Sequence, residues 1–194
     1  PVEYQIDGGT QMPIDSGRGN TFGSMLRSVL RQDPDVILVG EIRDDETART
    51  AMQAAMTGHL VFSTVHAKDT VAAVFRLLDL RVEPYLVANS LSLVLAQRLV
   101  RTLCDRCKAE VPASPGLVSR MGRYGRGITK TYAPVGCKAC LKTGYRGRHA
   151  LFELLDVNDE LRDIILSNPN ISEMKKVINE CQFTTLAEFG WKLA

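Results

Sequence analysis

Residues 30–44 read Leu-Arg-Gln-Asp-Pro-Asp-Val-Ile-Leu-Val-Gly-Glu-Ile-Arg-Asp, and this segment decides the fold class. Its centre, residues 36–39, is a short and wholly apolar run rich in β-branched side chains, and it ends at Gly40. Runs of this kind are typical of buried strands in parallel sheets whose two faces are both covered. We therefore expect residues 36–39 to form such a strand.

Helical and strand-like segments alternate along the first hundred residues. Asp44 or Asp45 can cap a helix over residues 46–56, which are rich in Ala, Met and Gln. The following segments are a strand-like run, a helical pattern and an amphipathic helix, expected at residues 60–65, 70–80 and 84–100. The β-α-β-α order predicts an α/β fold with a mostly parallel sheet.

The composition is that of a folded soluble protein. Of the 194 residues, 45% are hydrophobic and 24% are charged, which excludes a disordered chain or a fibre. No apolar run approaches the ~18 residues that span a bilayer, and no basic leader precedes a hydrophobic stretch. We expect a cytoplasmic protein and, because the chain opens at Pro1 without a methionine, a fragment of a longer one.

Basic residues are concentrated in one part of the chain. Residues 111–152 contain no Asp or Glu and carry a charge of +8, which leaves −6 for the remainder of a chain whose net charge is +2. The basic residues are Arg120, Arg123, Arg126, Lys130, Lys138, Lys142, Arg146 and Arg148. Such asymmetry indicates a change of domain, a contact surface for an acidic partner, or a solvated basic face.

Four of the five cysteines form two Cys-x-x-Cys pairs, which are Cys104 with Cys107 and Cys137 with Cys140. Two such pairs supply four thiolates that can surround Zn²⁺ tetrahedrally, and we favour this reading. Two disulfides or an iron–sulfur cluster are the alternatives. The remaining cysteine, Cys181, is expected to pack as a small hydrophobic side chain.

The composition changes at the first cysteine pair, where glycines, prolines and basic residues become frequent. We therefore expect three parts, a core over residues 1–102, a metal-binding module over 103–150 and a helical subdomain over 151–194. A site with four thiolate ligands has no open position, so its zinc would be structural.

Glu41 is the strongest catalytic candidate from position alone. It follows the strand expected at residues 36–39, and open α/β sheets bind ligands just beyond the carboxyl ends of their strands. Nucleotide hydrolases use an acid in this place to hold magnesium or to polarise the attacking water. Surface carboxylates also follow many strands in other proteins, so position alone does not assign a catalytic role to Glu41. The residues that flank it must be considered as well.

With its flanks, the segment 30–44 resembles the signature of the secretion and pilus-assembly ATPases, the motor family of type II secretion and type IV pili. Residues 1–8 are similar to the second half of the aspartate box of this family, and residues 57–66 are similar to its histidine box. Residues 96–101 match as well, and residues 136–148 resemble the tetracysteine module. This module is carried by the assembly and secretion motors and is generally lacking in the retraction motors.

The resemblance implies a role for each of four residues. Glu41 would be the Walker B acid near magnesium, and Glu3 would be the remaining carboxylate of the aspartate box. His66, with His59 behind it, would sense or orient the γ-phosphate, although His59 could instead serve as a structural histidine after a helix C-terminus. Arg43 is expected to pair with a nearby acid and fix the loop, with phosphate contact as the alternative.

The resemblance also implies a truncated RecA-like core that, in a full-length homo-hexamer, converts ATP hydrolysis into pseudopilus or pilus assembly and protein secretion. The sequence contains no Gly-rich loop with Lys-Ser/Thr, which such enzymes need to cradle the phosphates. In this family the loop lies upstream of the aspartate box. We therefore expect ATP and Mg²⁺ to bind only in the full-length protein, and this chain alone to be inactive.

The expected partners are the inner-membrane platform proteins of the secretion or pilus system, which would place the protein peripherally on that membrane. The basic module could also contact an acidic partner or anionic lipid. Nucleic acid is not expected, because aromatic residues are not interleaved with the basic ones. The alternative function is a non-catalytic, zinc-stabilised interaction module built on half an ATPase fold.

Overall fold

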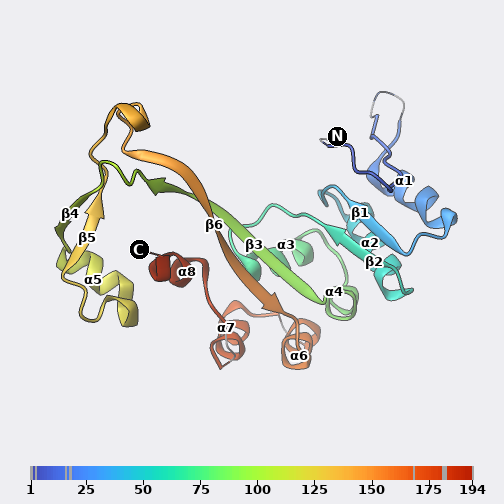
Figure 1. The fold of residues 1–194 in the computed structure, drawn as a ribbon. Coiled ribbons are helices and arrows are strands. Elements are labelled where there is room, and N and C mark those ends of the chain that lie inside the picture. The colour runs from blue at the N-terminus through green and yellow to red at the C-terminus, as the bar shows by residue number, and fades with distance from the viewer. Residues whose placement is uncertain are drawn as a thin grey trace. The chain divides into compact units, whose positions relative to one another are not determined.

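The computed structural model describes residues 2, 4–15, 17, 19–167, 169–180 and 183–193 (Figure 1). Glu3 and Cys181, for which the sequence predicts roles, lie outside the described residues. The fold divides into two units. Unit 1 comprises Pro1–Val94 with Asp156–Glu180, and unit 2 comprises Leu95–Leu155 with Cys181–Ala194.

Unit 1 contains a pair of short parallel strands, with helices before, between and after them in the chain. Its elements are α1 (Phe22–Val29), η2 (Leu30–Gln32), β1 (Val36–Val39), α2 (Asp45–Met56), β2 (Leu60–Ser63), α3 (Thr70–Asp79), α4 (Pro84–Ser90), α6 (Asp159–Ser167) and α7 (Ile171–Glu180). β1 pairs with β2 in register from Val36↔Leu60 to Val39↔Ser63. The predicted α/β class is therefore confirmed.

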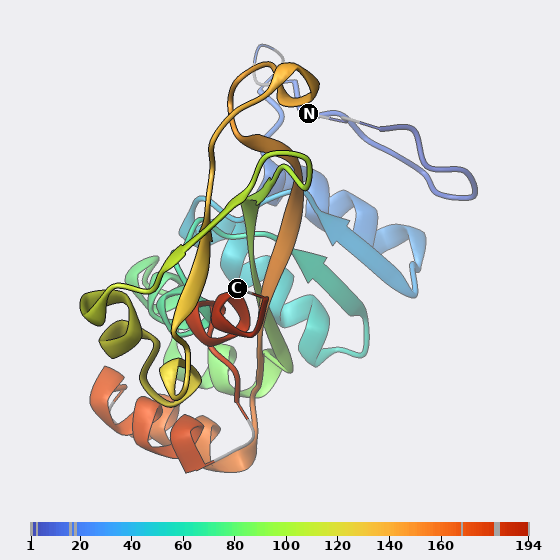
Figure 2. The ribbon, with the colours of Figure 1, turned by 60° about the vertical axis from the view of Figure 1, so that its left-hand side comes forward.

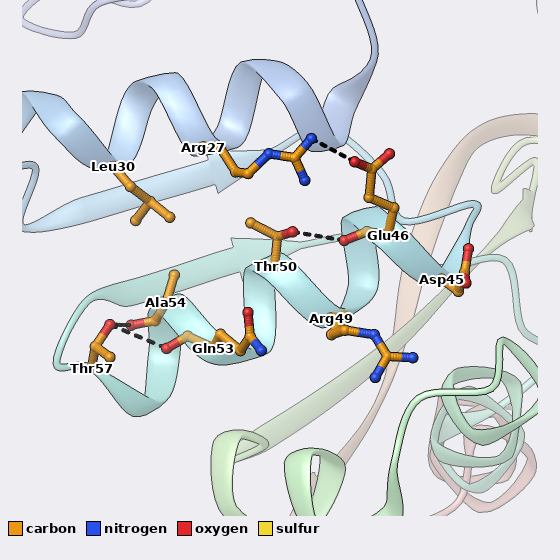
Figure 3. Close-up of a pocket in the computed structure, with 9 residues that line it drawn as sticks. All are labelled: Arg27, Leu30, Asp45, Glu46, Arg49, Thr50, Gln53, Ala54 and Thr57. Carbon is orange, nitrogen blue, oxygen red and sulfur yellow. Dashed lines mark hydrogen bonds and ion pairs between the residues drawn. The ribbon is translucent and has the colours of Figure 1, made fainter.

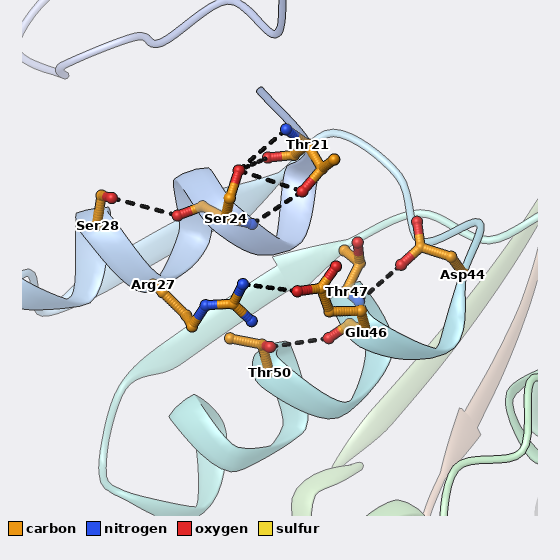
Figure 4. Close-up of polar contacts among 8 residues, drawn as sticks. All are labelled: Thr21, Ser24, Arg27, Ser28, Asp44, Glu46, Thr47 and Thr50. Atoms are coloured by element: carbon orange, nitrogen blue, oxygen red, sulfur yellow. Dashed lines mark hydrogen bonds and ion pairs between the residues drawn. The ribbon is translucent and has the colours of Figure 1, made fainter. Parts of the chain in front are cut away.

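Side-chain caps define where the helices of unit 1 begin. The Asp44 carboxylate, rather than that of Asp45, accepts a hydrogen bond from the Thr47 amide at 2.8 Å and so starts α2 (Figure 4). Thr21 and Ser24 form a reciprocal capping box at the start of α1, with N···O distances of 3.0 and 3.1 Å. Such caps satisfy amide groups that have no partner inside the helix.

The core of unit 1 lies between helices. Fully buried apolar side chains come from five of its helices, α2, α3, α4, α6 and α7, namely Ala48, Val74, Val87, Ile165 and Met174. Full burial of a Val, Ile or Met side chain stabilises the folded state by roughly 1.5–3 kcal/mol relative to leaving it exposed. Arg162 of α6 donates from Nε to the carbonyl of Ala88 in α4 at 3.2 Å, which adds a polar contact between two packed helices.

One face of the β1–β2 pair is uncovered among the described residues. Ile37 and Val39 are each 5% exposed, whereas the alternate side chains are 52–65% exposed, namely Val36, Leu38, Leu60 and Phe62. Side chains alternate between the two faces of a strand, so the helices in the described part of the chain cover only one face of this pair. The prediction that residues 36–39 are covered on both faces is wrong for the described structure.

The prediction of a helix over residues 84–100 is also wrong for the second half of that range. α4 ends at Ser90, Leu91 has an extended backbone, and β3 (Leu93–Leu103) begins two residues later. β3 pairs with β6 (Tyr145–Asp156), and their arrows point in opposite directions (Figures 1 and 2). Pairing with a distant segment overrides a local apolar spacing that suits either a helix or a strand.

Unit 2 is built on two-stranded sheets. In addition to β3 and β6 it contains β4 (Ala109–Pro112), α5 (Pro115–Met121), η3 (Gly122–Gly125), β5 (Lys130–Ala133), η4 (Lys138–Cys140) and α8 (Leu186–Leu193). β4 and β5 are antiparallel, with Glu110 opposite Tyr132. Among the described residues, no helix combines the length and the apolar character that crossing a bilayer requires.

Helix α8 is attached to the β6 strand through polar and aromatic contacts. The Leu186 amide at its start donates to the Glu153 carboxylate of β6 at 2.9 Å, and Glu153 is 5% exposed. Phe189 meets Phe152 edge to face, with the ring centroids 6.4 Å apart. These contacts hold the last described helix against unit 2.

Candidate functional site

Glu41 and His66 meet at the carboxyl edge of the β1–β2 pair. Each residue follows the end of its strand, and His66 Nε2 lies 3.3 Å from Glu41 Oε2. The Glu41 side chain is 16% exposed and that of His66 is 87% exposed. The sequence reasoning that a histidine after the neighbouring strand could reach the carboxylate matches this geometry, because parallel strands end at the same edge.

Arg43 contacts the other oxygen of the same carboxylate. Its Nη2 atom forms an ion pair with Glu41 Oε1, which is the loop-fixing arrangement expected from the sequence. The side-chain hydrogen bond from Arg43 holds the pKa of Glu41 below its usual range, the charges of Arg43 and His66 act in the same direction, and burial opposes them. Glu41 is therefore an ionised acceptor at neutral pH.

The backbone around Glu41 is held by the end of β2. Thr64 Oγ1 donates to the Gly40 carbonyl at 2.7 Å, and the Ile42 amide donates to the Thr64 carbonyl at 2.9 Å. Ser63 Oγ donates to the Val39 carbonyl at 2.9 Å, one residue further from Glu41, and so joins the two strands without contacting a peptide group next to the acid. Sequence reasoning missed these hydroxyl contacts, and the only signal for them was the adjacent Ser63-Thr64 pair at a strand end.

A carboxylate in this position suits a magnesium ion. Mg²⁺ is commonly held by one or two protein carboxylates together with water and substrate phosphates. Glu41 supplies one ionised carboxylate, and its two oxygens have one donor partner each among the described side chains, Arg43 and His66. A carboxyl oxygen has two lone pairs, so each oxygen retains capacity for a further ligand.

His59 lies at the opposite end of β2 from His66. Its backbone amide and its Nδ1 atom both lie within hydrogen-bond distance of the Ala54 carbonyl, at 3.2 and 2.9 Å. Thr57 Oγ1 is 3.3 Å from the same ring nitrogen. This arrangement caps the C-terminal end of α2, which is the structural alternative considered for His59, and the structure does not bring the residue to Glu41.

The four paired cysteines form a cluster in unit 2. The sulfur atoms of Cys104, Cys107, Cys137 and Cys140 all lie within 4.8 Å of one another. The sulfurs of Cys104 and Cys137 are 4.0 Å apart, and those of Cys107 and Cys140 are 3.8 Å apart. All four are free thiols, so the disulfide alternative is not found, and the cluster could hold a metal ion.

Backbone amides point at the sulfur atoms of this cluster. Cys140 Sγ accepts from the Cys137 amide at 3.1 Å and from the Gly144 amide at 3.3 Å, and Cys107 Sγ accepts from the Gly136 amide at 3.3 Å. The Cys137 amide is the main cause that lowers the pKa of Cys140 to about 6, whereas burial raises the pKa of Cys107 to about 11. A cluster of four sulfurs, two of which accept from backbone amides, fits a tetrahedral zinc ion, which binds thiolates.

The two cysteine loops are fixed to each other by the backbone. The Cys104 amide donates to the Gly144 carbonyl at 2.9 Å, which joins the first loop to the second. Gly136 has a φ of +104°, and a Cβ atom there would lie 2.6 Å from the Lys142 carbonyl oxygen. Only glycine fits this close approach without strain.

Part of the basic excess in unit 2 is paired internally. Lys130 forms an ion pair with Glu110 across the β4–β5 pair, at 2.5 Å, and Arg123 forms one with Glu188 of α8 at 2.7 Å. These acids come from both sides of the 111–152 segment, so the local charge is smaller than the sequence count suggests.

A separate groove lies between α1–η2 and α2. It has a volume of about 550 Å³ and is lined by residues that include Arg27, Leu30, Arg49 and Thr57 (Figure 3). Arg27 and Glu46 form an ion pair of 2.6 Å at its border (Figures 3 and 4). None of the described candidate site residues lines this groove.

Comparison with known proteins gives one family for the whole chain. The family model described as type II/IV secretion system protein matches residues 1–193. The chain is 45% identical over 192 residues to the type IV pilus assembly ATPase PilB of Thermus thermophilus, covering 98% of this chain and 22% of the relative. It is 50% identical over 165 residues to type II secretion system protein E of Pectobacterium carotovorum, covering 85% and 33% respectively.

Solved structures give a consistent fold. The pilus retraction motor PilT with bound ADP matches with a TM-score of 0.59 and 27% identity, covering 89% of this chain and 39% of the motor. The Legionella pneumophila ATPase DotB matches with a TM-score of 0.62 and 22% identity, covering 96% and 43%, and this likeness concerns the fold alone. The chain thus spans between a fifth and a third of the length of the two curated relatives named above.

Proposed function

The chain belongs to the type II/IV secretion system protein family, and we propose that it is the C-terminal part of a secretion or pilus-assembly ATPase. The observation that carries this proposal is the ionised Glu41 at the carboxyl edge of β1, with His66 beside it. In the full-length protein, ATP hydrolysis would drive pseudopilus or pilus assembly and protein secretion across the outer membrane.

In this proposal, each residue at the carboxyl edge of the β1–β2 pair has a separate role in catalysis. Bound magnesium would neutralise phosphate charge, and Glu41 would be its protein ligand or would orient the attacking water. His66 would sense the γ-phosphate, because its ring already reaches the carboxylate and is otherwise open to solvent. Glu3 would add the carboxylate of the aspartate box. His59 would support His66 from the opposite end of β2, by fixing the end of α2 and the start of β2.

The architecture that supports this activity would be a truncated RecA-like core, a zinc module and a helical tail, at residues 1–102, 103–150 and 151–194. Zinc would be held by Cys104, Cys107, Cys137 and Cys140 and would be structural, since four sulfur ligands leave no open position. The full-length protein would be a homo-hexamer. Its partners would be the platform proteins of the inner membrane, at the cytoplasmic face, with anionic lipid as a further contact of the basic module.

The chain alone is proposed to be inactive. Its sequence contains no Gly-rich loop with Lys-Ser/Thr, so nothing in it can cradle the phosphates in the manner of this enzyme class. ATP and Mg²⁺ would bind once that loop is present on the same polypeptide. The alternative, a non-catalytic zinc-stabilised interaction module, predicts no ATPase activity in any extended form.

One comparison tests the proposal against this alternative. Magnesium-dependent ATP hydrolysis and metal content are measured for the 194-residue chain, for the complete protein that contains it, and for that protein with Glu41→Gln. We expect activity only in the complete protein, loss of that activity in Glu41→Gln, and zinc in all three. Robust hydrolysis by the short chain, or an inactive complete protein, would contradict the proposal.

A further inference from the structure

Thr64 holds both peptide groups that flank Glu41. Its hydroxyl donates to the Gly40 carbonyl at 2.7 Å, and its own carbonyl accepts from the Ile42 amide at 2.9 Å. The first contact fixes the peptide that precedes Glu41, and the second fixes the peptide that follows it. Because the Cα–Cβ direction depends on these two peptide planes, the contacts of one residue set where the carboxylate can point.

We infer that Thr64 is a positioning residue for Glu41, and this inference rests on the proposed role of Glu41 in ATP hydrolysis. The same strand end carries His66, whose ring contacts Glu41 Oε2 at 3.3 Å. The end of β2 therefore holds the acid twice, through the backbone at Thr64 and through the side chain at His66. A shift of this strand end would move the carboxylate with it.

We call the two contacts of Thr64 with the peptides that flank Glu41 the clamp. Holding the two strands together does not by itself require the clamp. Thr64 is exposed, and the Ser63 hydroxyl already joins the two strands through the Val39 carbonyl at 2.9 Å. The two hydroxyls make the same kind of bond between the same strand ends. They differ in that only the Thr64 hydroxyl reaches a peptide group next to Glu41, so Ser63 provides a matched control.

Amide hydrogen exchange on the 194-residue chain tests the clamp without nucleotide or metal. We expect Thr64→Val to speed exchange of residues 40–43 by about two- to tenfold, the range that one lost hydrogen bond supplies. Thr64→Ser keeps the hydroxyl and should restore the slow rate, and Ser63→Ala should leave these amides unchanged. Thr64→Ala removes the hydroxyl with a smaller side chain and takes the place of Thr64→Val if that variant does not fold.

Steady-state kinetics of the complete protein then test the consequence for the acid. We expect kcat of Thr64→Val to fall by about tenfold with a raised Mg²⁺ requirement and little change in the KM for ATP, because misplacing a catalytic group affects the reaction more than binding. Thr64→Ser should recover most of this loss, and Ser63→Ala should stay within about twofold of the unsubstituted protein.

The outcomes separate this inference from the proposed function. If Glu41→Gln is inactive while Thr64→Val exchanges and turns over normally, the positioning role is overturned and the proposed function stands. Equal defects in Thr64→Val and Ser63→Ala would also overturn it, since strand closure alone would explain them. If Glu41→Gln keeps its activity, the proposed function of this edge fails, and the positioning role fails with it.

Discussion

His66 Nε2 lies 3.3 Å from Glu41 Oε2, although the two residues follow different strands. Arg43, which lies on the same loop as Glu41, contacts the other carboxylate oxygen. The acid is thus held from its own loop and from the neighbouring strand end. This arrangement keeps Glu41 ionised and makes its orientation depend on how β1 and β2 pair.

Removing Arg43 should raise the pKa of Glu41 toward the ordinary range of glutamate. The Arg43 hydrogen bond is the largest cause of the lowered pKa, so Arg43→Gln should shift it more than His66→Gln does. Titration of the Glu41 carboxyl carbon by NMR measures both shifts. A lowered pKa contributes stability that is present above the ordinary glutamate pKa and is lost as pH falls through the lowered one. Equal shifts in the two variants would contradict the assignment of Arg43 as the main partner.

The cysteine cluster should copurify with zinc. We expect about one zinc ion per chain, and loss of most of it in Cys140→Ser, because a four-ligand structural site tolerates few changes. Asp105→Asn is the control, since Asp105 lies between Cys104 and Cys107 in the chain but its carboxylate pairs with Lys108 at 2.8 Å. Metal should also be released on acidification, because protons compete for the thiolates. Elemental analysis across pH measures these effects, and full zinc in Cys140→Ser would refute the four-ligand assignment.

A glycine in the second cysteine loop should not tolerate alanine. Gly136→Ala places a Cβ atom 2.6 Å from the Lys142 carbonyl oxygen in a backbone with a φ of +104°. Gly147→Ala is a matched control, because Gly147 also has a positive φ, +84°, but has nothing within 4 Å of the added atom. The positive φ alone costs roughly 1–2 kcal/mol. Thermal melts should therefore show a larger loss for Gly136→Ala, and equal losses would mean that the close approach relaxes freely.

Sequence patterns predicted the contacts that depend on spacing and on strand ends. Glu41 and His66 could be placed together because the ends of parallel strands lie at one edge of a sheet. The spacing of the two cysteine pairs predicted that the four cysteines form a cluster. The strand at residues 93–103 could not be predicted, because its apolar spacing suits two periods and only pairing with β6 selects one. The clamp by Thr64 was missed for a similar reason, since its hydroxyl bonds to Gly40, which follows another strand.

At the start of α8, Glu188 takes part both in a helix cap and in an ion pair, so the contributions of the two interactions to stability can be compared. Glu188 Oε2 accepts from the Thr185 amide at 3.1 Å, while Oε1 pairs with Arg123, whose side chain is 67% exposed. The Thr185 amide is the largest cause that lowers the pKa of Glu188. The stability that this cap contributes is therefore present at neutral pH and is lost as pH falls through the lowered pKa.

Glu188→Ala should lower the free energy of unfolding by about 1 kcal/mol, because it removes one side of the capping box. Arg123→Ala should lower it by clearly less than Glu188→Ala does, since an exposed ion pair is screened by water. Urea denaturation measures both changes, and hydrogen exchange of residues 186–193 locates them in α8. If Arg123→Ala were as destabilising as Glu188→Ala, the ion pair rather than the cap would hold this helix.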